Sequence, residues 1–222
     1  MPHFINNKLK YILTTNYKVM YTTLCQQKNL SKINNRNITI KYLIRSNYLK
    51  DYNHFLFVRN PYKRIISFFQ DKFYYFPSQA QDNFCWDNWE SSHKIFFPYL
   101  EIHKRTSANV IKTKLLSFKF DKFIKLLPQV YSLGDHLWPQ YNISNLHFRF
   151  ITFKKIEFDK ILKMESNKDM VFASTNLELD LTTKHRMTKP ASIDSYFSSS
   201  SYQIVNSIYK DDFLNYNYHL RK

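Results

Sequence analysis

Glycine is nearly absent from this sequence, because Gly134 is the single glycine among 222 residues. The scarcity excludes phosphate loops that depend on several glycines, such as the Gly-x-x-x-x-Gly-Lys-[Ser/Thr] loop of many kinases. Cysteine is scarce as well, since Cys25 and Cys85 are the only two. Two cysteines are too few for a disulfide scaffold and do not have metal-ligand spacing, so we expect a reduced, cytoplasmic location.

Long apolar runs are also missing. No stretch approaches the roughly 18 residues of a membrane span, and residues 1–11 lack the apolar core of a signal peptide. We therefore expect neither a membrane span nor a targeting segment. The sequence has 44% hydrophobic and 18% aromatic residues, which is enough apolar material to offset the entropy lost on folding. Its length of 222 residues predicts one globular domain over residues 1–222.

Acidic residues are few compared with basic ones. There are 17 Asp and Glu residues against 33 Lys and Arg residues, which gives a formal net charge of +16. A surface with this charge attracts anions: nucleic acid, anionic lipid, or a phosphorylated or acidic small molecule. The charge alone does not choose among these partners.

Short apolar runs alternate with helix signals in the first part of the chain. Residues 11–13 predict a strand, and a Thr-x-x-Gln pattern from Thr23 predicts a capped helix after a brief loop. Residues 55–58 form a continuous apolar run, which is typical of a strand buried on both faces. Asn60 and Pro61 then predict the N-cap and the first residue of the next helix.

In the helix that follows, apolar residues repeat at helical spacing, and Lys63, Arg64 and Ser67 lie off the apolar stripe. The further expected elements are a helix over residues 120–127 that ends near Pro128, a loop over 131–145, a strand over 148–153, a helix over 157–167 and a helix entered through residues 198–201. Strands that alternate with helices predict an α/β fold with a central parallel sheet flanked by helices.

Two segments contain the residue types of a phosphate site. The first is Tyr-Lys-Val-Met-Tyr-Thr-Thr-Leu at residues 17–24, in which Lys18, Thr22 and Thr23 lie between a strand and a helix N-terminus. Free amide groups and the helix dipole favour a phosphate there, the hydroxyl groups add donors, and the lysine supplies a mobile charge. The alternative interpretation is that the threonines only cap the helix and Lys18 is solvated.

The second segment, residues 57–73, is more specific. Arg59 lies at the carboxyl end of a buried strand, which is where ligands of open α/β sheets bind. Ser67 follows two helical turns later and can face the same crevice, and an arginine there suits a phosphate. The alternative interpretation is that Arg59 pairs with a carboxylate and Ser67 faces water.

Together the two segments resemble the 5′-phosphosulfate and 3′-phosphate signatures of the sulfotransferases, especially the carbohydrate sulfotransferase group. In that family a Lys-x-x-x-Thr-[Ser/Thr] loop follows the first strand, and an Arg-[Asp/Asn]-Pro-[aromatic]-x-Arg-x-x-Ser segment follows a later strand. The matching positions here are Lys18, Thr22, Thr23, Arg59 and Ser67. Weaker similarities in residues 135–140, 153–157 and 208–213 extend the resemblance over residues 11–218.

The resemblance implies a P-loop-like nucleotide-binding fold and a metal-free transfer of a sulfuryl group. The donor would be 3′-phosphoadenosine 5′-phosphosulfate (PAPS), and the acceptor a hydroxyl group of a carbohydrate or glycoconjugate. Lys18 would bind the leaving phosphate oxygen, and Arg59 and Ser67 would bind the 3′-phosphate. Met20 and Tyr21 depart from the family pattern, because they replace small residues that let the backbone approach the phosphosulfate closely.

The acceptor hydroxyl group needs a base, and histidine is the side chain best suited to that role near neutral pH. We expect His136 to be this base, with Trp138 stacking on a sugar, and His54 and His93 as alternatives. A lone histidine in a loop is more often a plain surface residue. Arg186 lies in a basic segment where the resemblance places a loop over the nucleotide, although such a run is often only a solvated surface.

Two other functions fit part of the pattern. A net charge of +16 with interleaved aromatic residues also fits a nucleic-acid-binding module that tracks a phosphate backbone and stacks bases. The Arg-Asn-Pro segment disfavours that alternative, because the informative residues lie at strand ends and helix starts, and we expect no nucleic-acid partner. A nucleoside or sugar kinase ranks last, since the sequence lacks the glycine loop and a clear metal-binding carboxylate.

Overall fold

The computed structural model describes residues 2–33, 50–81, 84, 86–148, 151–155, 157–182 and 192–222, and for 143–148 and 151–155 it describes the backbone. The chain divides into two compact units. The first unit contains Met1–Asn60, Pro139–Met187 and Asp211–Tyr218, and the second contains Pro61–Trp138, Thr188–Lys210 and His219–Lys222. The expectation that residues 1–222 are one domain remains a prediction.

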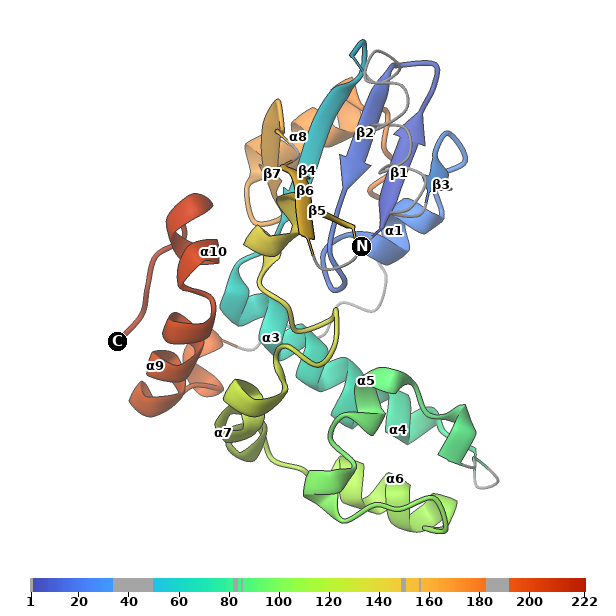
Figure 1. The fold of residues 1–222 in the computed structure, drawn as a ribbon, viewed down its shortest axis with the longest axis vertical. Helices are drawn as coiled ribbons and strands as arrows, with labels where there is room; N and C mark the ends of the chain where they lie inside the picture. The colour runs from blue at the N-terminus through green and yellow to red at the C-terminus, as the bar shows by residue number, and fades with distance from the viewer. Residues whose placement is uncertain are drawn as a thin grey trace. The chain divides into compact units, whose positions relative to one another are not determined.

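The first unit is built on a five-stranded sheet with the strand order β3-β1-β2-β4-β7 (Figure 1). Its strands are β1 (His3–Asn6), β2 (Tyr11–Thr14), β3 (Ser31–Ile33), β4 (Asn53–Val58) and β7 (Lys160–Lys163). The predicted α/β fold with parallel central strands is confirmed, because β2, β4 and β7 pair in parallel. The sheet as a whole is mixed, since β1 is antiparallel to β2 and β3. The turn between β1 and β2 is too short for the crossover that parallel pairing needs.

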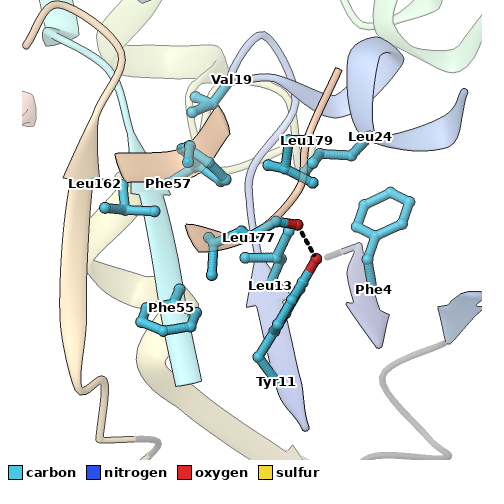
Figure 2. Packing of buried hydrophobic residues seen from close by; sticks show 11 residues of the cluster. Phe4, Tyr11, Leu13, Val19, Leu24, Phe55, Phe57, Leu162, Leu177 and Leu179 are labelled. Carbon is cyan, nitrogen blue, oxygen red and sulfur yellow. Dashed lines mark hydrogen bonds between the residues drawn. The ribbon is translucent and has the colours of Figure 1, made fainter. Parts of the chain in front are cut away.

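One face of this sheet packs against the helices α1 (Tyr21–Cys25) and α8 (Asn167–Asn176). The buried core on this face consists of Phe4, Tyr11, Leu13, Val19, Leu24, Phe55, Phe57, Leu162, Ala173, Leu177 and Leu179 (Figure 2). Burial of one large apolar side chain contributes about 1.5–3 kcal/mol. The hydroxyl group of Tyr11 donates to the carbonyl oxygen of Leu177 at 2.6 Å, which ties the segment after α8 to β2.

The opposite face of the sheet is covered too. Leu56 and Val58 of β4 pack with Tyr216, which follows the helix α10 (Lys210–Asn215). Alternate residues of β4 therefore enter two different cores, and the predicted buried strand at residues 55–58 is confirmed. Burial on both faces explains why this strand reads as a continuous apolar run.

The second unit is mainly helical. Its helices are α3 (Pro61–Gln70), the π-helical turn η1 (Asp71–Tyr75), α4 (Phe76–Gln79), α5 (Ser91–Lys94), α6 (Ala108–Leu116), α7 (Phe120–Val130) and α9 (Ser199–Ile208), with the 3₁₀ turns η2 (Trp86–Asn88), η3 (Pro98–Leu100) and η5 (Ile193–Ser195). Phenylalanine rings 5.0–6.4 Å apart fill its core: Phe68, Phe69, Phe73, Phe96, Phe118, Phe120 and Phe123. These tilted, edge-on and stacked pairs add to the stability that burial gives.

Three of the predicted helices are confirmed. α3 begins at Pro61, and α9 begins after Ser198, whose hydroxyl group accepts from the Ser201 amide at 3.3 Å. α7 begins at Phe120 as expected but continues through Pro128 to Val130. Pro128 lies in the last turn, where the helix loses one hydrogen bond without being broken. Within the described residues, no helix is both long enough and apolar enough to cross a membrane.

Of the two elements predicted within residues 148–167, the strand is confirmed in part and the helix is wrong. The predicted strand at 148–153 falls on an antiparallel hairpin of β5 (Asn145–Phe148) and β6 (Ile151–Lys155), which the 3₁₀ turn η4 (Gln140–Ser144) precedes. Residues 151–153 are therefore extended as predicted, and residues 149–150 lie outside the described residues. In place of the predicted helix at 157–167, the residues Lys160–Lys163 form strand β7, in which Leu162 lies opposite Phe57. A short apolar pair does not distinguish a helix from a strand, and here pairing with β4 decides the outcome.

Candidate functional site

The loop after β2 is held in one shape by its own hydrogen bonds. The Thr15 hydroxyl group donates to the Val19 carbonyl oxygen, and the Val19 amide donates to the Asn16 carbonyl oxygen at 3.2 Å. Lys18 and Met20 have left-handed backbone angles, with φ of 66° and 55°. This conformation costs roughly 1–2 kcal/mol for each residue with a side chain. Strain of this kind persists where surrounding contacts enforce it, and it is concentrated at ligand sites.

Helix α1 begins directly after this loop, with Met20 at the N-cap and no side-chain cap hydrogen bond. The predicted cap at Thr23 is wrong, because the helix already starts at Tyr21 and both Thr22 and Thr23 lie in its first turn. Thr22 is exposed and Thr23 is half-buried. Amide groups in an uncapped first turn favour an anionic group, and the two hydroxyl groups add donors beside them.

Arg59 follows the last residue of β4, at the same sheet edge as the loop after β2. Its guanidinium Nη1 donates to the carbonyl oxygen of Lys18 at 3.0 Å. The predicted placement of Lys18 and Arg59 at one edge of the sheet is therefore confirmed, while their roles in binding remain predictions. Two cations from neighbouring strand ends create a positive field there, which suits an anion with more than one charge.

Two buried residues, Gln140 and Asp212, support this edge of the sheet. The Gln140 side-chain amide contacts both the N–H and the carbonyl group of Arg59, at 2.9 and 2.8 Å. The Asp212 carboxylate accepts from the amides of Gln140 and Tyr141 at 2.9 and 2.7 Å, and from Gln140 Nε2 at 3.3 Å. Gln140 and Asp212 are each 0% exposed. We call Arg59, Gln140, Tyr141 and Asp212 the Gln140 network.

A further carboxylate lies at the end of β4. Glu165 accepts from the Asn60 amide at 3.1 and 3.2 Å and from the Tyr218 hydroxyl group at 3.0 Å. Burial and the negative charge of Glu165 raise the pKa of Tyr218 above its ordinary value. The Tyr218 hydroxyl group therefore stays protonated and remains a donor to this carboxylate.

Ser67 and His136 belong to the second unit. Ser67 is half-buried on α3, and His136 is half-buried in the loop that follows α7. The imidazole ring of His136 lies against Phe68, with ring centroids 6.1 Å apart. The structure places each of them within the second unit, and their roles at a site shared with Lys18 remain predictions.

Arg64 and Tyr209 hold the backbone around His136. Arg64, which the helical spacing puts off the apolar stripe of α3, is nevertheless only 1% exposed. Its guanidinium donates to the carbonyl oxygens of His136 and Trp138, and the Tyr209 hydroxyl group donates to that of Leu137 at 2.7 Å. The hydrogen bonds from Arg64 to His136 and Trp138 both come from Nη2, and its guanidinium lies 5.5 Å from the centroid of the Tyr209 ring, so a cation–π contact also compensates its burial.

A second cluster of polar residues lies in the helical unit, and we call it the Lys72 cluster: Asp71, Lys72, Glu90, Ser92 and His93. Lys72 is 4% exposed, and its ammonium group pairs with Asp71 at 2.8 Å and with Glu90. Ser92 donates to Glu90 at 3.1 Å. His93 is 0% exposed, and its ring lies 4.7 Å from that of Phe76.

The two alternative histidines, His54 and His93, are both buried. Burial, and after it the positive charge of Lys72, lowers the pKa of His93 to about 4. A base with that pKa is poorly matched to chemistry near neutral pH. His54 lies within β4, where it is 8% exposed and its backbone amide donates to Asp159 at 2.6 Å.

Two further predictions concern Arg186 and a metal site. Arg186 lies outside the described residues. Across the part of the chain that the structure does describe, no group of three or more His, Cys, Asp or Glu residues could hold a metal ion.

The supporting residues were present in the sequence as weak signals. Arg64 occupies the second arginine of the Arg-[Asp/Asn]-Pro-[aromatic]-x-Arg-x-x-Ser segment. Gln140 ends the Asp-His-Leu-Trp-Pro-Gln segment, and Asp212 lies in the closing Ile-Tyr-Lys-Asp-Asp-Phe segment. Their contacts could not be predicted, because 72 positions separate Gln140 from Asp212 and nothing local pairs them.

The chain was compared with known proteins. No curated protein and no solved structure matches it. The model of a family described as "Sulfotransferase family" matches residues 4–219. Because this match includes nearly the whole chain and both units, the chain belongs to the sulfotransferase family.

Proposed function

We propose that this sulfotransferase moves a sulfuryl group from PAPS to a hydroxyl group of a carbohydrate or glycoconjugate. The observation that carries the proposal is the contact between Arg59 and Lys18, which places two cations at the carboxyl ends of β2 and β4. Ligands of α/β sheets bind at such ends. The loop is held in a left-handed conformation at Lys18 and Met20, as expected of a backbone shaped for a ligand.

The residues at this edge fit the phosphosulfate part of the donor. PAPS supplies an electrophilic sulfur and a bisphosphate leaving group. Lys18 would hold the phosphate oxygen on which negative charge grows as the sulfur–oxygen bond breaks, and such stabilisation is a main source of catalysis in transfers of this type. Thr22 and Thr23, with the uncapped amide groups of α1, would orient the same phosphate.

The residues for the 3′-phosphate are Arg59 and Ser67. Arginine suits a phosphate because its donors are planar and always charged. The two residues would distinguish PAPS from nucleotides without a 3′-phosphate, and they would affect donor binding more than the chemical step. Arg186 would add positive charge over the nucleotide.

On the acceptor side, His136 would take the proton of the hydroxyl group while its oxygen forms the new bond to sulfur. The carbonyl groups of residues 136–138 are fixed by Arg64 and Tyr209, so the backbone that carries His136 is held in place. The indole of Trp138 donates to Ser132 at 2.9 Å and is half-buried. A partly exposed indole is a suitable surface for stacking on a sugar, which supports the carbohydrate acceptor.

Isothermal titration with adenosine 3′,5′-bisphosphate and with AMP tests the donor. We expect the bisphosphate to bind at least about tenfold more tightly, which corresponds to about 1.4 kcal/mol. Equal weak binding of both nucleotides, together with tight binding of single-stranded DNA, would instead support the nucleic-acid-binding alternative. Transfer of radiolabelled sulfate from PAPS to a panel of glycans tests the acceptor, and the carbohydrate part of the proposal fails if only non-carbohydrate hydroxyl groups become labelled.

A further inference from the structure

The Gln140 network links a buried carboxylate to the proposed donor site through a chain of hydrogen bonds. Asp212 accepts three hydrogen bonds from Gln140 and Tyr141, at 2.7–3.3 Å. Hydrogen bonds to an ionised carboxylate are stronger than those between neutral groups. Because one of the three donors is Gln140 Nε2, the carboxylate determines which way the side-chain amide of Gln140 faces.

The orientation of this amide matters for Arg59. With Nε2 turned to Asp212 and to the Arg59 carbonyl oxygen, Oε1 is the atom that can accept from the Arg59 amide. The side chain of Gln140 thus pairs with the backbone of Arg59 as a neighbouring strand would, one residue beyond the end of β4. A buried amide that satisfies both groups of a peptide unit fixes that unit firmly.

Arg59 transmits this constraint to the loop after β2. Its guanidinium donates to the carbonyl oxygen of Lys18 at 3.0 Å, and Lys18 has a left-handed backbone that requires support from its surroundings. The chain of contacts therefore runs from Asp212 through Gln140 and Arg59 to Lys18, within a single unit.

We propose that Gln140 and Asp212 are positioning residues for the donor site. Asp212 orients the amide of Gln140, Gln140 fixes the backbone of Arg59, and Arg59 holds the loop that presents Lys18. The inference rests on the proposed donor-binding function of Lys18 and Arg59. Neither Gln140 nor Asp212 needs to touch the donor.

The variant Gln140→Glu tests this role with almost no change of volume. A carboxylate at position 140 cannot donate to the Arg59 carbonyl oxygen, and it places a second negative charge beside Asp212. Like charges at short distance raise the pKa of one partner, so the new acid should become protonated at mildly acidic pH and regain a donor. A role in bulk stability alone would not give a donor affinity that recovers in this way.

The readout is the Kd of the full-length chain for adenosine 3′,5′-bisphosphate, expressed at each pH as the ratio of variant to wild type. We expect a ratio of at least about ten at pH 8, the effect of losing one well-placed hydrogen bond, and a ratio that falls as the pH is lowered to 6. Asp212→Asn, which keeps one oxygen acceptor, should give a smaller increase without the recovery.

Asn206→Asp is the matched control, because it makes the same change from amide to carboxylate in the second unit. The Asn206 amide donates to the Arg221 carbonyl oxygen at 2.8 Å and accepts from Tyr62. The Kd ratio of Asn206→Asp should stay near one at both pH values.

Two outcomes overturn the positioning role. If Gln140→Glu does not fold at pH 8, a ratio near one in Asp212→Asn overturns it. A ratio near one in folded Gln140→Glu does the same. If the wild type itself does not bind the bisphosphate, the proposed function fails together with the positioning role. If the wild type binds it and the ratio stays near one, only the positioning role fails.

Discussion

The two units bury their polar groups in different ways. In the first unit, the Asp212 carboxylate accepts from backbone and amide N–H groups, and its partners lead to Arg59 and Lys18. In the second unit, the Lys72 cluster places an ammonium group between two carboxylates and contains the buried imidazole of His93. The first arrangement consists of matched donors and acceptors, and the second contains a buried group whose charge depends on pH.

The difference indicates what each cluster does. Buried carboxylates whose oxygens are filled by N–H donors fix the geometry of the residues that supply them. A histidine that is buried near an ammonium group instead makes the folded state unfavourable for its protonation, because burial and the neighbouring positive charge both disfavour the charged form. We therefore expect changes at the first cluster and its neighbours to affect binding and turnover, and changes at the second to affect stability in acid.

Lys18→Ala should have the largest effect of these variants, and the quantity that decreases should be the turnover number. Its charge is most useful when negative charge develops on the leaving oxygen, so the loss appears in kcat more than in donor affinity. Removal of such an electrostatic donor typically lowers kcat by about 100-fold or more. Sulfate transfer assayed under saturating PAPS, with folding checked by circular dichroism, measures it. Near-normal kcat would contradict the role of Lys18.

His136→Ala should also reduce turnover, by about 100-fold if the imidazole is the general base. Because a base must be neutral to accept a proton, the wild-type rate should rise with pH through the pKa of that base, and the variant should lose this rise. Donor binding measured by titration should stay normal. If the transfer rate of the variant is lower by the same factor at every pH, another residue is the base.

Arg59→Ala and Ser67→Ala sharpen the comparison, because one residue belongs to each unit. Each loses a hydrogen bond to a charged phosphate, worth roughly 1.5–3 kcal/mol, or about 10-fold to 150-fold in donor Kd. In Ser67→Ala the effect should appear as weaker binding of adenosine 3′,5′-bisphosphate with little change for AMP. In Arg59→Ala the binding of AMP should weaken too, because Arg59 also holds the loop that carries Lys18. Lys63→Ala, an exposed change on the same helix α3, is the control. Unchanged Kd in Ser67→Ala alone would restrict the phosphate site to the first unit.

His93→Leu should have the smallest effect at pH 7 and a clear effect in acid. The pKa of His93 falls from 6.5 to about 4 on folding, because of burial first and the charge of Lys72 second. Between these values the unfolded chain binds more protons, so the stability that neutral His93 allows is complete above 6.5 and is lost as the pH falls towards 4. Urea midpoints measured from pH 7 to pH 4.5 should decrease less in the variant than in the wild type.

The exposed His103 provides the control for that series. His103→Leu removes an imidazole from the same unit without unburying or burying a titratable group, so its urea midpoints should follow the wild-type pH dependence. Equal slopes for His93→Leu and the wild type would show that the Lys72 cluster does not govern acid stability.

The parts of the fold that could be predicted are those with a local cause. The strand at 55–58 has no polar residue to compete with burial, and Pro61 sets the start of the next helix, so Arg59 could be placed at a strand end. Lys18 could be placed at the same edge of the sheet, because the carboxyl ends of parallel strands lie together there. The left-handed angles of Lys18 and Met20 were not predictable, since neither residue type favours them.

The parts that could not be predicted depend on long-range contacts. Strand β7 takes its form from pairing with β4, a hundred residues earlier in the chain, and its own residues are equally compatible with a helix. Arginine is usually a surface residue, and the burial of Arg64 is compensated by long-range contacts with the carbonyl groups of His136 and Trp138 and with the Tyr209 ring. The contact between Gln140 and Asp212 also joins residues that are far apart in the sequence. The residues proposed to contact the donor could therefore be predicted from the sequence, and the residues that support them could not.

The left-handed residues also affect how heat-resistant the protein can become. Among the described residues, Glu101 and Glu178 have φ of 52° and 51°, and neither takes part in the proposed site. A glycine at either turn would adopt the same angle without steric strain, and part of the gain would be offset by the larger entropy of the unfolded chain. A sequence with one glycine thus keeps unused room for thermostabilisation in its turns.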